Sequence, residues 1–108
     1  MKKNLIYENN LSCMDDIKNF VLEGSAQIYF ENNKMRMKNA LSEDLGQKSN
    51  FVFWCDKEFP SDIMIEWDFR PIEEPGLAIM FFCARGCNGE DLFDNTLAPR
   101  DGQYDLYH

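Results

Sequence analysis

The chain has little positive charge. It carries 11 Lys and Arg residues against 19 Asp and Glu residues, a net charge of −8 over 108 residues. Phosphate contacts need clustered Lys and Arg, so this balance argues against a nucleic-acid partner and against an anionic membrane surface. The densest basic group is Lys34, Arg36 and Lys38. Its alternate spacing predicts one solvated face of a strand.

Histidine and cysteine are also scarce. The single histidine is His108, and the four cysteines are irregularly spaced. Such a set is too small and too irregular for a disulfide framework, although three pairings would be possible. Cys83 and Cys87 lie four residues apart, but no second pair of zinc ligands follows. We therefore expect reduced cysteines, no metal site and no cofactor.

Long apolar runs are missing. No stretch approaches the roughly 18 apolar residues of a membrane span. A signal peptide needs an apolar run after its basic start, but Glu8 and three Asn stand at that place. The sequence also has no internal repeat, low-complexity tract or long helical periodicity. These features predict a cytoplasmic protein without a membrane partner.

What the sequence does contain is a series of short segments with strand patterning. In residues 62–70, Ile63, Ile65, Trp67 and Phe69 alternate with residues that are mostly charged. This period of two predicts a strand with Trp67 on its core face. Residues 77–84 are apolar without a break, as a strand covered on both faces should be.

Three further segments complete the expected β-structure. Residues 27–31 and 34–38 predict a hairpin, because Asn32 and Asn33 between them tolerate positive φ. Residues 51–55 (FVFWC) predict another strand. Residues 9–19 predict a loop with one helical turn capped by Asp15. Residues 40–50 and the chain after Arg85 predict loops. Strands joined by turns, with 14% aromatic residues, favour an all-β sandwich or jelly roll.

Longer strings of residues point to a family. FVFWC, then FP, WDF, PIE, PG, GEDLFD and finally YDLYH resemble the bacterial YesU-like family of unknown function. The resemblance implies a concanavalin A-like lectin/glucanase jelly roll and a role connected with plant cell-wall polysaccharides. It also implies a chain about twice as long as this one. We therefore expect residues 1–108 to be a single β-sandwich domain or, preferably, the N-terminal half of one. An incomplete jelly roll would expose apolar strand faces, so we expect self-association.

Paired carboxylates give the most specific chemical hypothesis. Glu66 and Asp68 share the polar face of the 62–70 strand, where such pairs can serve as nucleophile and acid in glycoside hydrolysis. Many glucanases with this fold use a Glu-x-Asp-x-Glu strand, but the third position here is Arg70. The simpler interpretation is that this face is only solvated. A third interpretation is that it binds sugar hydroxyls without catalysis.

Other candidate binding residues come from three places. Trp54 is either a stacking platform for a sugar ring or a core residue. The acidic loop 89–94 would rim the sheet or hold Ca²⁺, with Arg85 and Arg100 paired to its acids. Aromatic and basic residues gather near the C-terminus, where stacking and proton donation suit a saccharide site. The full set of expected substrate-binding residues is Trp54, Arg70, Glu90, Asp91, Arg100, Tyr104, Tyr107 and His108.

Three functions stay open on this basis. The first is carbohydrate binding on the polar face of a β-sheet. The second is a glycoside hydrolase or lyase that uses Glu66 and Asp68. The third is a structural or interaction domain without chemistry.

Overall fold

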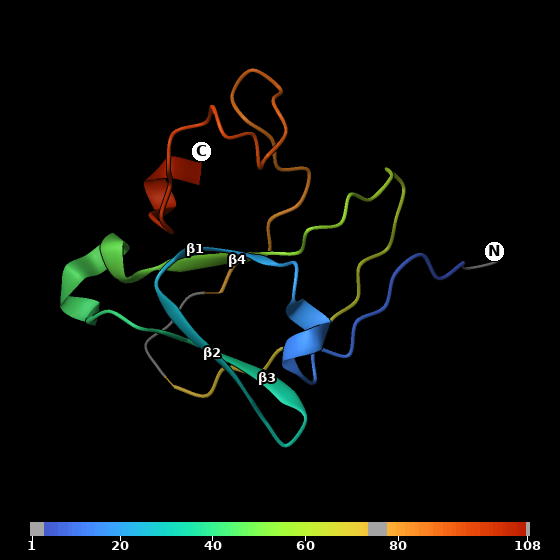
Figure 1. Ribbon diagram of the computed structural model, residues 1–108, viewed down its shortest axis with the longest axis horizontal. Helices are drawn as coiled ribbons and strands as arrows, with labels where there is room; N and C mark the ends of the chain where they lie inside the picture. The colour runs from blue at the N-terminus through green and yellow to red at the C-terminus, as the bar shows by residue number, and fades with distance from the viewer. Residues whose placement is uncertain (1–3, 74–77, 108) are drawn as a thin grey trace. The chain divides into compact units, whose positions relative to one another are not determined.

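The computed structural model describes residues 4–73 and 78–107 (Figure 1). Strands and single-turn or short 3-10 helices make up the regular structure of these residues, and no α-helix occurs in them. This composition agrees with the predicted all-β class. The elements in chain order are η1 (Met14–Ile17), β1 (Val21–Gly24), β2 (Ala26–Glu31), β3 (Lys34–Asn39), η2 (Glu43–Ser49), β4 (Phe51–Trp54) and η3 (Tyr104–Tyr107).

The chain divides into two compact units. The first contains the residues up to 57 together with those from 100 onward, and the second contains residues 58–99. Every strand and 3-10 helix named above belongs to the first unit. Within the described ranges, no helix has the length and apolarity needed to cross a membrane.

The predicted hairpin is confirmed. β2 pairs antiparallel with β3 in a register that places Glu31 opposite Lys34 and Phe30 opposite Met35. Asn32 and Asn33 form the two-residue turn with φ of 54° and 58°. Two consecutive residues with positive φ match the right-handed twist of a hairpin, and Asn adopts that conformation at low cost.

A second antiparallel pair joins β1 to β4, with Val21 opposite Trp54 and Gly24 opposite Phe51. The FVFW strand was predicted from its composition, but β1 was not. Four residues ending in glycine carry too little pattern to reveal a strand. Next to this pair, the rings of Phe20 and Phe53 lie 5.2 Å apart between centroids, in a tilted arrangement.

The core of the first unit is small: Ile17 and Trp54 are its buried apolar side chains among the described residues. Ile17 ends η1, the helical turn expected in residues 9–19. We had predicted that Asp15 caps this turn, and that prediction is wrong. Cys13 precedes the turn and Asp15 lies inside it. Residues 40–50 also differ from the predicted loop, because Ser42 caps a 3-10 segment by accepting from the amide of Asp44.

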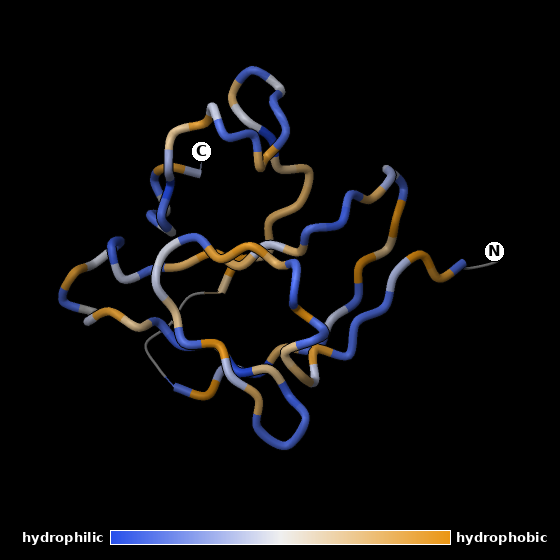
Figure 2. Tube along the Cα trace, in the orientation of Figure 1, coloured by the Kyte–Doolittle hydropathy of each residue, from blue (hydrophilic) through white to orange (hydrophobic). Residues whose placement is uncertain are grey.

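The second unit corrects two strand predictions. Residues 62–70 and the described part of 77–84, from 78 onward, contain no paired strand, and Leu77 lies outside the described residues. Trp67, predicted as a core residue, is 58% exposed. A strand needs a neighbour for its backbone groups, and no described segment pairs with these. Figure 2 shows their apolar residues along the trace.

Candidate functional site

A cluster of three side chains in the first unit joins the C-terminal segment to β1. The guanidinium of Arg100 donates from Nε to Oε1 of Glu23 at 2.9 Å and from Nη2 to Oε2. The hydroxyl of Tyr107 donates to the same Oε1 at 2.7 Å. Arg100 and Glu23 lie 77 residues apart in sequence, so the cluster is a long-range tie. Its Arg fork on a carboxylate is the bidentate geometry that makes such pairs strong and directional.

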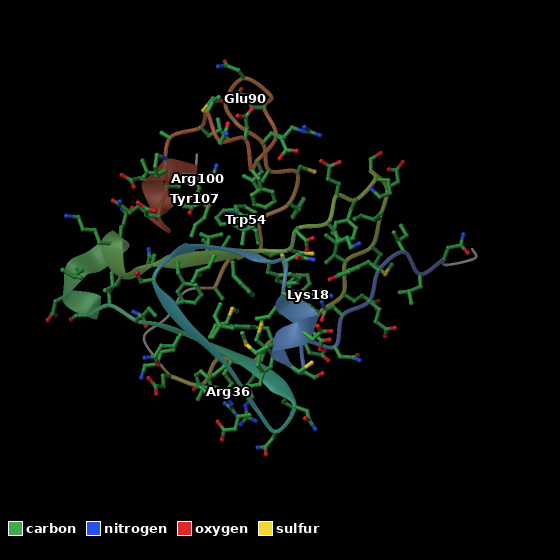
Figure 3. All side chains as sticks on the ribbon, in the orientation of Figure 1. Lys18, Arg36, Trp54, Glu90, Arg100 and Tyr107 are labelled. Atoms are coloured by element: carbon green, nitrogen blue, oxygen red, sulfur yellow. The ribbon has the colours of Figure 1, made fainter. Side chains whose placement is uncertain are left out.

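Aromatic contacts close the cluster on one side. The guanidinium carbon of Arg100 lies 5.5 Å from the ring centroid of Tyr107, within cation–π range. The rings of Trp54 and Tyr107 are 6.4 Å apart between centroids. Figure 3 shows Arg100 and Tyr107 next to each other, with Trp54 beyond them. The side chains of Arg100 and Glu23 are only 16% and 15% exposed.

The cluster fixes the charge of its members. Burial works to raise the pKa of Glu23, but hydrogen bonds from Arg100, Tyr107 and Trp54 outweigh it, so the pKa of this carboxyl is lowered. The hydrogen bond to Glu23 raises the pKa of Arg100. Burial, followed by the bond to Glu23, raises the pKa of Tyr107 to about 12. At neutral pH the cluster is therefore an ion pair with a neutral phenol.

Two glycines let the C-terminal segment lie close to the strands. Gly24 and Gly102 both have positive φ, of 91° and 79°. A Cβ on Gly24 would lie 2.7 Å from the carbonyl oxygen of Asn50, and a Cβ on Gly102 would lie 2.7 Å from Cα of Phe51. Both positions exclude a side chain, on conformation and on space. The backbone at Asn50 and Phe51 is thus held between the two glycines.

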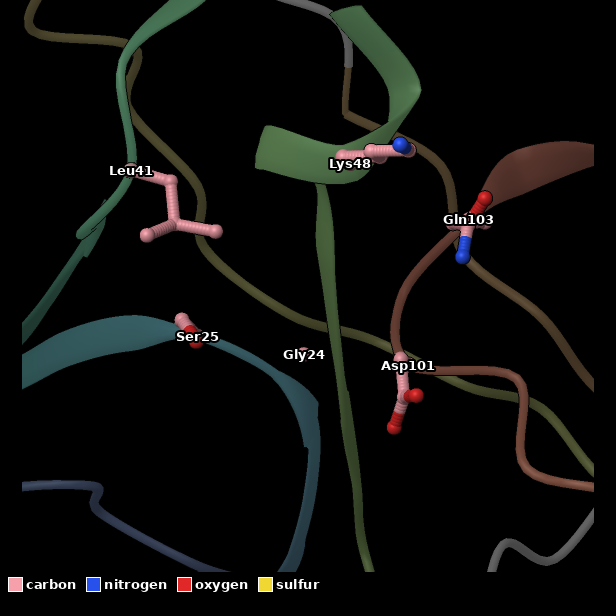
Figure 4. Close-up of a pocket in the computed structure, with 6 residues that line it drawn as sticks. All are labelled: Gly24, Ser25, Leu41, Lys48, Asp101 and Gln103. Atoms are coloured by element: carbon pink, nitrogen blue, oxygen red, sulfur yellow. The ribbon is translucent and has the colours of Figure 1, made fainter. Parts of the chain in front are cut away.

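An open pocket of about 320 Å³ lies next to the Glu23–Arg100 ion pair (Figure 4). The residue that follows each partner in sequence lines it. Gly24 and Ser25 follow Glu23, and Asp101 and Gln103 follow Arg100. The residues that line it are Gly24, Ser25, Leu41, Lys48, Asp101 and Gln103.

The polar side chains of the pocket are free to bind. Within residues 4–73 and 78–107, the side chains of Ser25, Lys48, Asp101 and Gln103 take part in no hydrogen bond or ion pair. They offer a hydroxyl, an ammonium, a carboxylate and an amide. This set contains both donors and acceptors, and Leu41 adds an apolar wall. Such a pocket suits a small polar ligand with several hydroxyl groups.

The structure brings together three of the residues that the sequence singled out. Trp54, Arg100 and Tyr107 all belong to or adjoin the cluster around Glu23. Trp54 is 8% exposed and packs in the core, the alternative we gave to a stacking platform. Arg100 pairs with Glu23, which corrects the expectation that it pairs with the acidic loop 89–94.

The remaining predicted residues lie elsewhere. Glu66, Asp68 and Arg70 are exposed in the second unit, on backbone that forms no strand. They have no hydrogen bond or ion pair within the described part of the chain.

The loop 89–94 folds through its own turns. Oδ1 of Asp91 accepts from the amide of Phe93 at 2.9 Å. One carboxylate oxygen of Glu90 is buried without a hydrogen-bond partner among the described residues. No group of His, Cys, Asp and Glu in those residues is arranged to hold a metal ion. His108 lies outside the described residues, as does the side chain of Tyr104.

Sequence reasoning missed Glu23 and all four polar pocket residues. Glu23 sits in a strand too short to recognise, and its partners are 77 and 84 residues away. The two glycines that flank the backbone of Asn50 and Phe51 were the available signal, because a glycine often marks close backbone approach.

Comparison with known proteins assigns the chain to a family. Residues 4–108 match the family described as "Domain of unknown function (DUF1961)". The chain is 43% identical over 103 residues to the "Uncharacterized protein YesU" of Bacillus subtilis (strain 168). The match covers 95% of this chain and 44% of that protein, so the chain spans less than half the length of the curated relative. No solved structure matches it. The chain belongs to the DUF1961 family, to which the resemblance to YesU-like proteins had pointed.

Proposed function

We propose that this chain belongs to a carbohydrate-binding protein with a concanavalin A-like jelly roll, and that a saccharide binds in the pocket lined by Ser25, Lys48, Asp101 and Gln103. The ligand class is a plant cell-wall oligosaccharide. The observation that carries the proposal is the pocket itself, with four polar side chains whose hydrogen-bonding capacity is unused within the described residues.

The chemistry of the pocket supports a sugar over other small ligands. A sugar hydroxyl donates and accepts at once, so its site needs both kinds of group side by side. Asp101 accepts, Lys48 donates, and the side chains of Ser25 and Gln103 do both. The apolar side chain of Leu41 offers contact to the C–H face of a ring. The volume of about 320 Å³ lies at the low end of the roughly 300–1,000 Å³ of small-molecule sites, which fits one ring of a longer saccharide.

The charge of the protein is consistent with a neutral or mixed ligand. A net charge of −8 repels polyanions at long range. Within the pocket, however, Lys48 and Asp101 balance each other. Binding should therefore depend on hydrogen bonds and shape, and weakly on salt.

Isothermal titration calorimetry with a panel of plant cell-wall oligosaccharides, pectic ones included, tests the proposal. Asp101→Asn and Lys48→Gln each remove one charged hydrogen-bonding group at near-constant volume, and Asn tolerates the positive φ of 52° at position 101. Each variant should weaken binding by about tenfold or more, because hydrogen bonds to charged groups are the stronger class. Lys18→Gln is the matched control, since Lys18 is an exposed lysine in η1's C-cap.

Two results would contradict the proposal. One is the absence of binding heat with every oligosaccharide in the panel. The other is binding that Asp101→Asn and Lys48→Gln leave at the level of the Lys18→Gln control.

A further inference from the structure

We infer that Glu23 is a positioning residue for the pocket. It holds the segment that supplies Asp101 and Gln103 against the strand that leads into Gly24 and Ser25. This inference rests on the proposed function, because it assigns Glu23 a role in the same site. Glu23 itself does not line the pocket.

Donors from two residues converge on the carboxylate of Glu23. Both oxygens of Glu23 accept from Arg100, and Oε1 also accepts from Tyr107. These two donors bracket the segment that contains Asp101 and Gln103. A single side chain of β1 therefore fixes both ends of the pocket's C-terminal wall.

A relay of two hydrogen bonds links Glu23 to the middle of that wall. The hydroxyl of Tyr107 donates to Glu23 at 2.7 Å and accepts from the backbone amide of Gly102 at 3.0 Å. Gly102 stands between Asp101 and Gln103, the two pocket residues of the segment. Their backbone is thus bonded to Glu23 through one intervening hydroxyl.

The C-terminal segment also contacts the rest of the first unit at two other points. Gly102 lies against the backbone of Phe51, where a Cβ would be only 2.7 Å from Cα. The amide of Asp105 also donates to the side chain of Gln47 at 3.0 Å. The segment is therefore held against the rest of the first unit at several points, and of these the cluster around Glu23 is charged and mostly shielded from water. Charged hydrogen bonds in such surroundings contribute most to local order.

The test combines local hydrogen exchange with ligand binding. Glu23→Gln keeps the volume of the side chain but places an amide NH₂ against the Arg100 fork. Tyr107→Phe removes only the hydroxyl of the relay and serves as the milder second variant. Glu31→Gln is the control, because Glu31 forms an ion pair of 3.1 Å with Arg36 in the same unit and its own side chain is 58% exposed.

Backbone exchange is read at the amides of Gly102, Gln103 and Leu106, all of which have acceptors here. We expect Glu23→Gln and Tyr107→Phe to raise exchange at these amides by about tenfold or more while the amides of the β2–β3 hairpin stay protected. Oligosaccharide affinity should fall by a similar factor in both variants, and the Glu31→Gln control should match the wild type in both readouts.

Unchanged exchange over residues 102–106 in both variants would overturn the inference. So would a rise of equal size in the β2–β3 hairpin, which indicates general destabilisation instead of positioning. Unchanged affinity with raised local exchange would also overturn it. If the wild-type protein binds no saccharide, the proposed function fails, and the exchange comparison alone then decides whether Glu23 holds the segment.

Discussion

Replacing Gly102 with alanine probes the close approach on which the whole C-terminal arrangement depends. Gly102 has a φ of 79°, and an added Cβ would lie 2.7 Å from Cα of Phe51 and 2.8 Å from the carbonyl carbon of Asn50. Both neighbours are backbone atoms of the segment that enters β4, so they cannot move aside as a flexible side chain would. The substitution therefore combines an unfavourable conformation with a steric clash.

The two costs are separable in magnitude. An L-residue in the left-handed region costs roughly 1–2 kcal/mol, and overpacking typically adds about 1–3 kcal/mol. We expect Gly102→Ala to lower the free energy of unfolding by about 3 kcal/mol. Gly89→Ala is the matched control: its φ of 82° is close to the 79° of Gly102, and nothing stands within 4 Å of the added Cβ. The control should show only the conformational cost.

Urea denaturation followed by Trp fluorescence measures both variants. Trp54 belongs to the core next to Gly102, and Trp67 lies in the unit that contains Gly89. The excess destabilisation of Gly102→Ala over Gly89→Ala reports the steric contact. Equal destabilisation by the two substitutions would refute the reasoning, since it would mean that Gly102 does not lie against the backbone of Asn50 and Phe51.

Four further results are expected. Arg100→Ala should destabilise the chain by about 2 kcal/mol in the same urea assay, below the roughly 3–5 kcal/mol of a fully buried pair because some exposure remains. Arg36→Ala should cost under about 1 kcal/mol, because the Glu31 side of its ion pair is 58% exposed. Equal effects would contradict this. The pKa of Glu23 is lowered, so its carboxylate contributes to the free energy of unfolding above its ordinary pKa of 4.5, and this contribution is lost as the pH falls through the lower folded value. A wild-type stability that changes with acid pH as little as that of Glu23→Gln would contradict this. The pKa of Tyr107 is raised to about 12, so its neutral hydroxyl contributes to stability below pH 10.0, and this contribution is lost as the pH rises towards 12. Ultraviolet titration of tyrosinate should show a late ionisation step that is missing in Tyr107→Phe. We propose that the chain self-associates through the exposed apolar residues of the second unit. Light scattering should show less self-association in Trp67→Asp, and a wild-type monomer at all concentrations would contradict the proposal.

Local signals in the sequence were sufficient for the β2–β3 hairpin. Alternation on both sides of Asn32 and Asn33 defines two strands and their turn within a dozen residues, and the structure has the same register. The strand predicted from composition at residues 51–55 is confirmed as β4, which ends at Trp54. Its partner β1 was not predicted, because its pairing of Val21 with Trp54 depends on contacts across the chain.

Residues 62–70 show the opposite case. Their alternation is as clear as that of the hairpin, but alternation only states which faces a strand would have. Whether a strand forms depends on a neighbour that completes its hydrogen bonds, and none of the described segments supplies one. A local pattern cannot report the presence of that neighbour.

The candidate site was predicted in part. Arg100 was named as a partner of the acidic loop 89–94, and Tyr107 came from the C-terminal cluster with Tyr104 and His108. The structure brings Arg100 and Tyr107 together. They meet at Glu23, 77 and 84 residues away. Ser25, Lys48, Asp101 and Gln103 carry no motif, since a pocket formed by separate segments leaves no spacing in the sequence.

The most direct test of the central claim is a map of backbone amide chemical shifts during titration with a plant cell-wall oligosaccharide. We expect the largest shifts at the amides of Ser25, Lys48, Asp101 and Gln103, with saturation at a common dissociation constant. Shifts centred instead on Glu66 and Asp68, or no shifts at saturating saccharide, would contradict it.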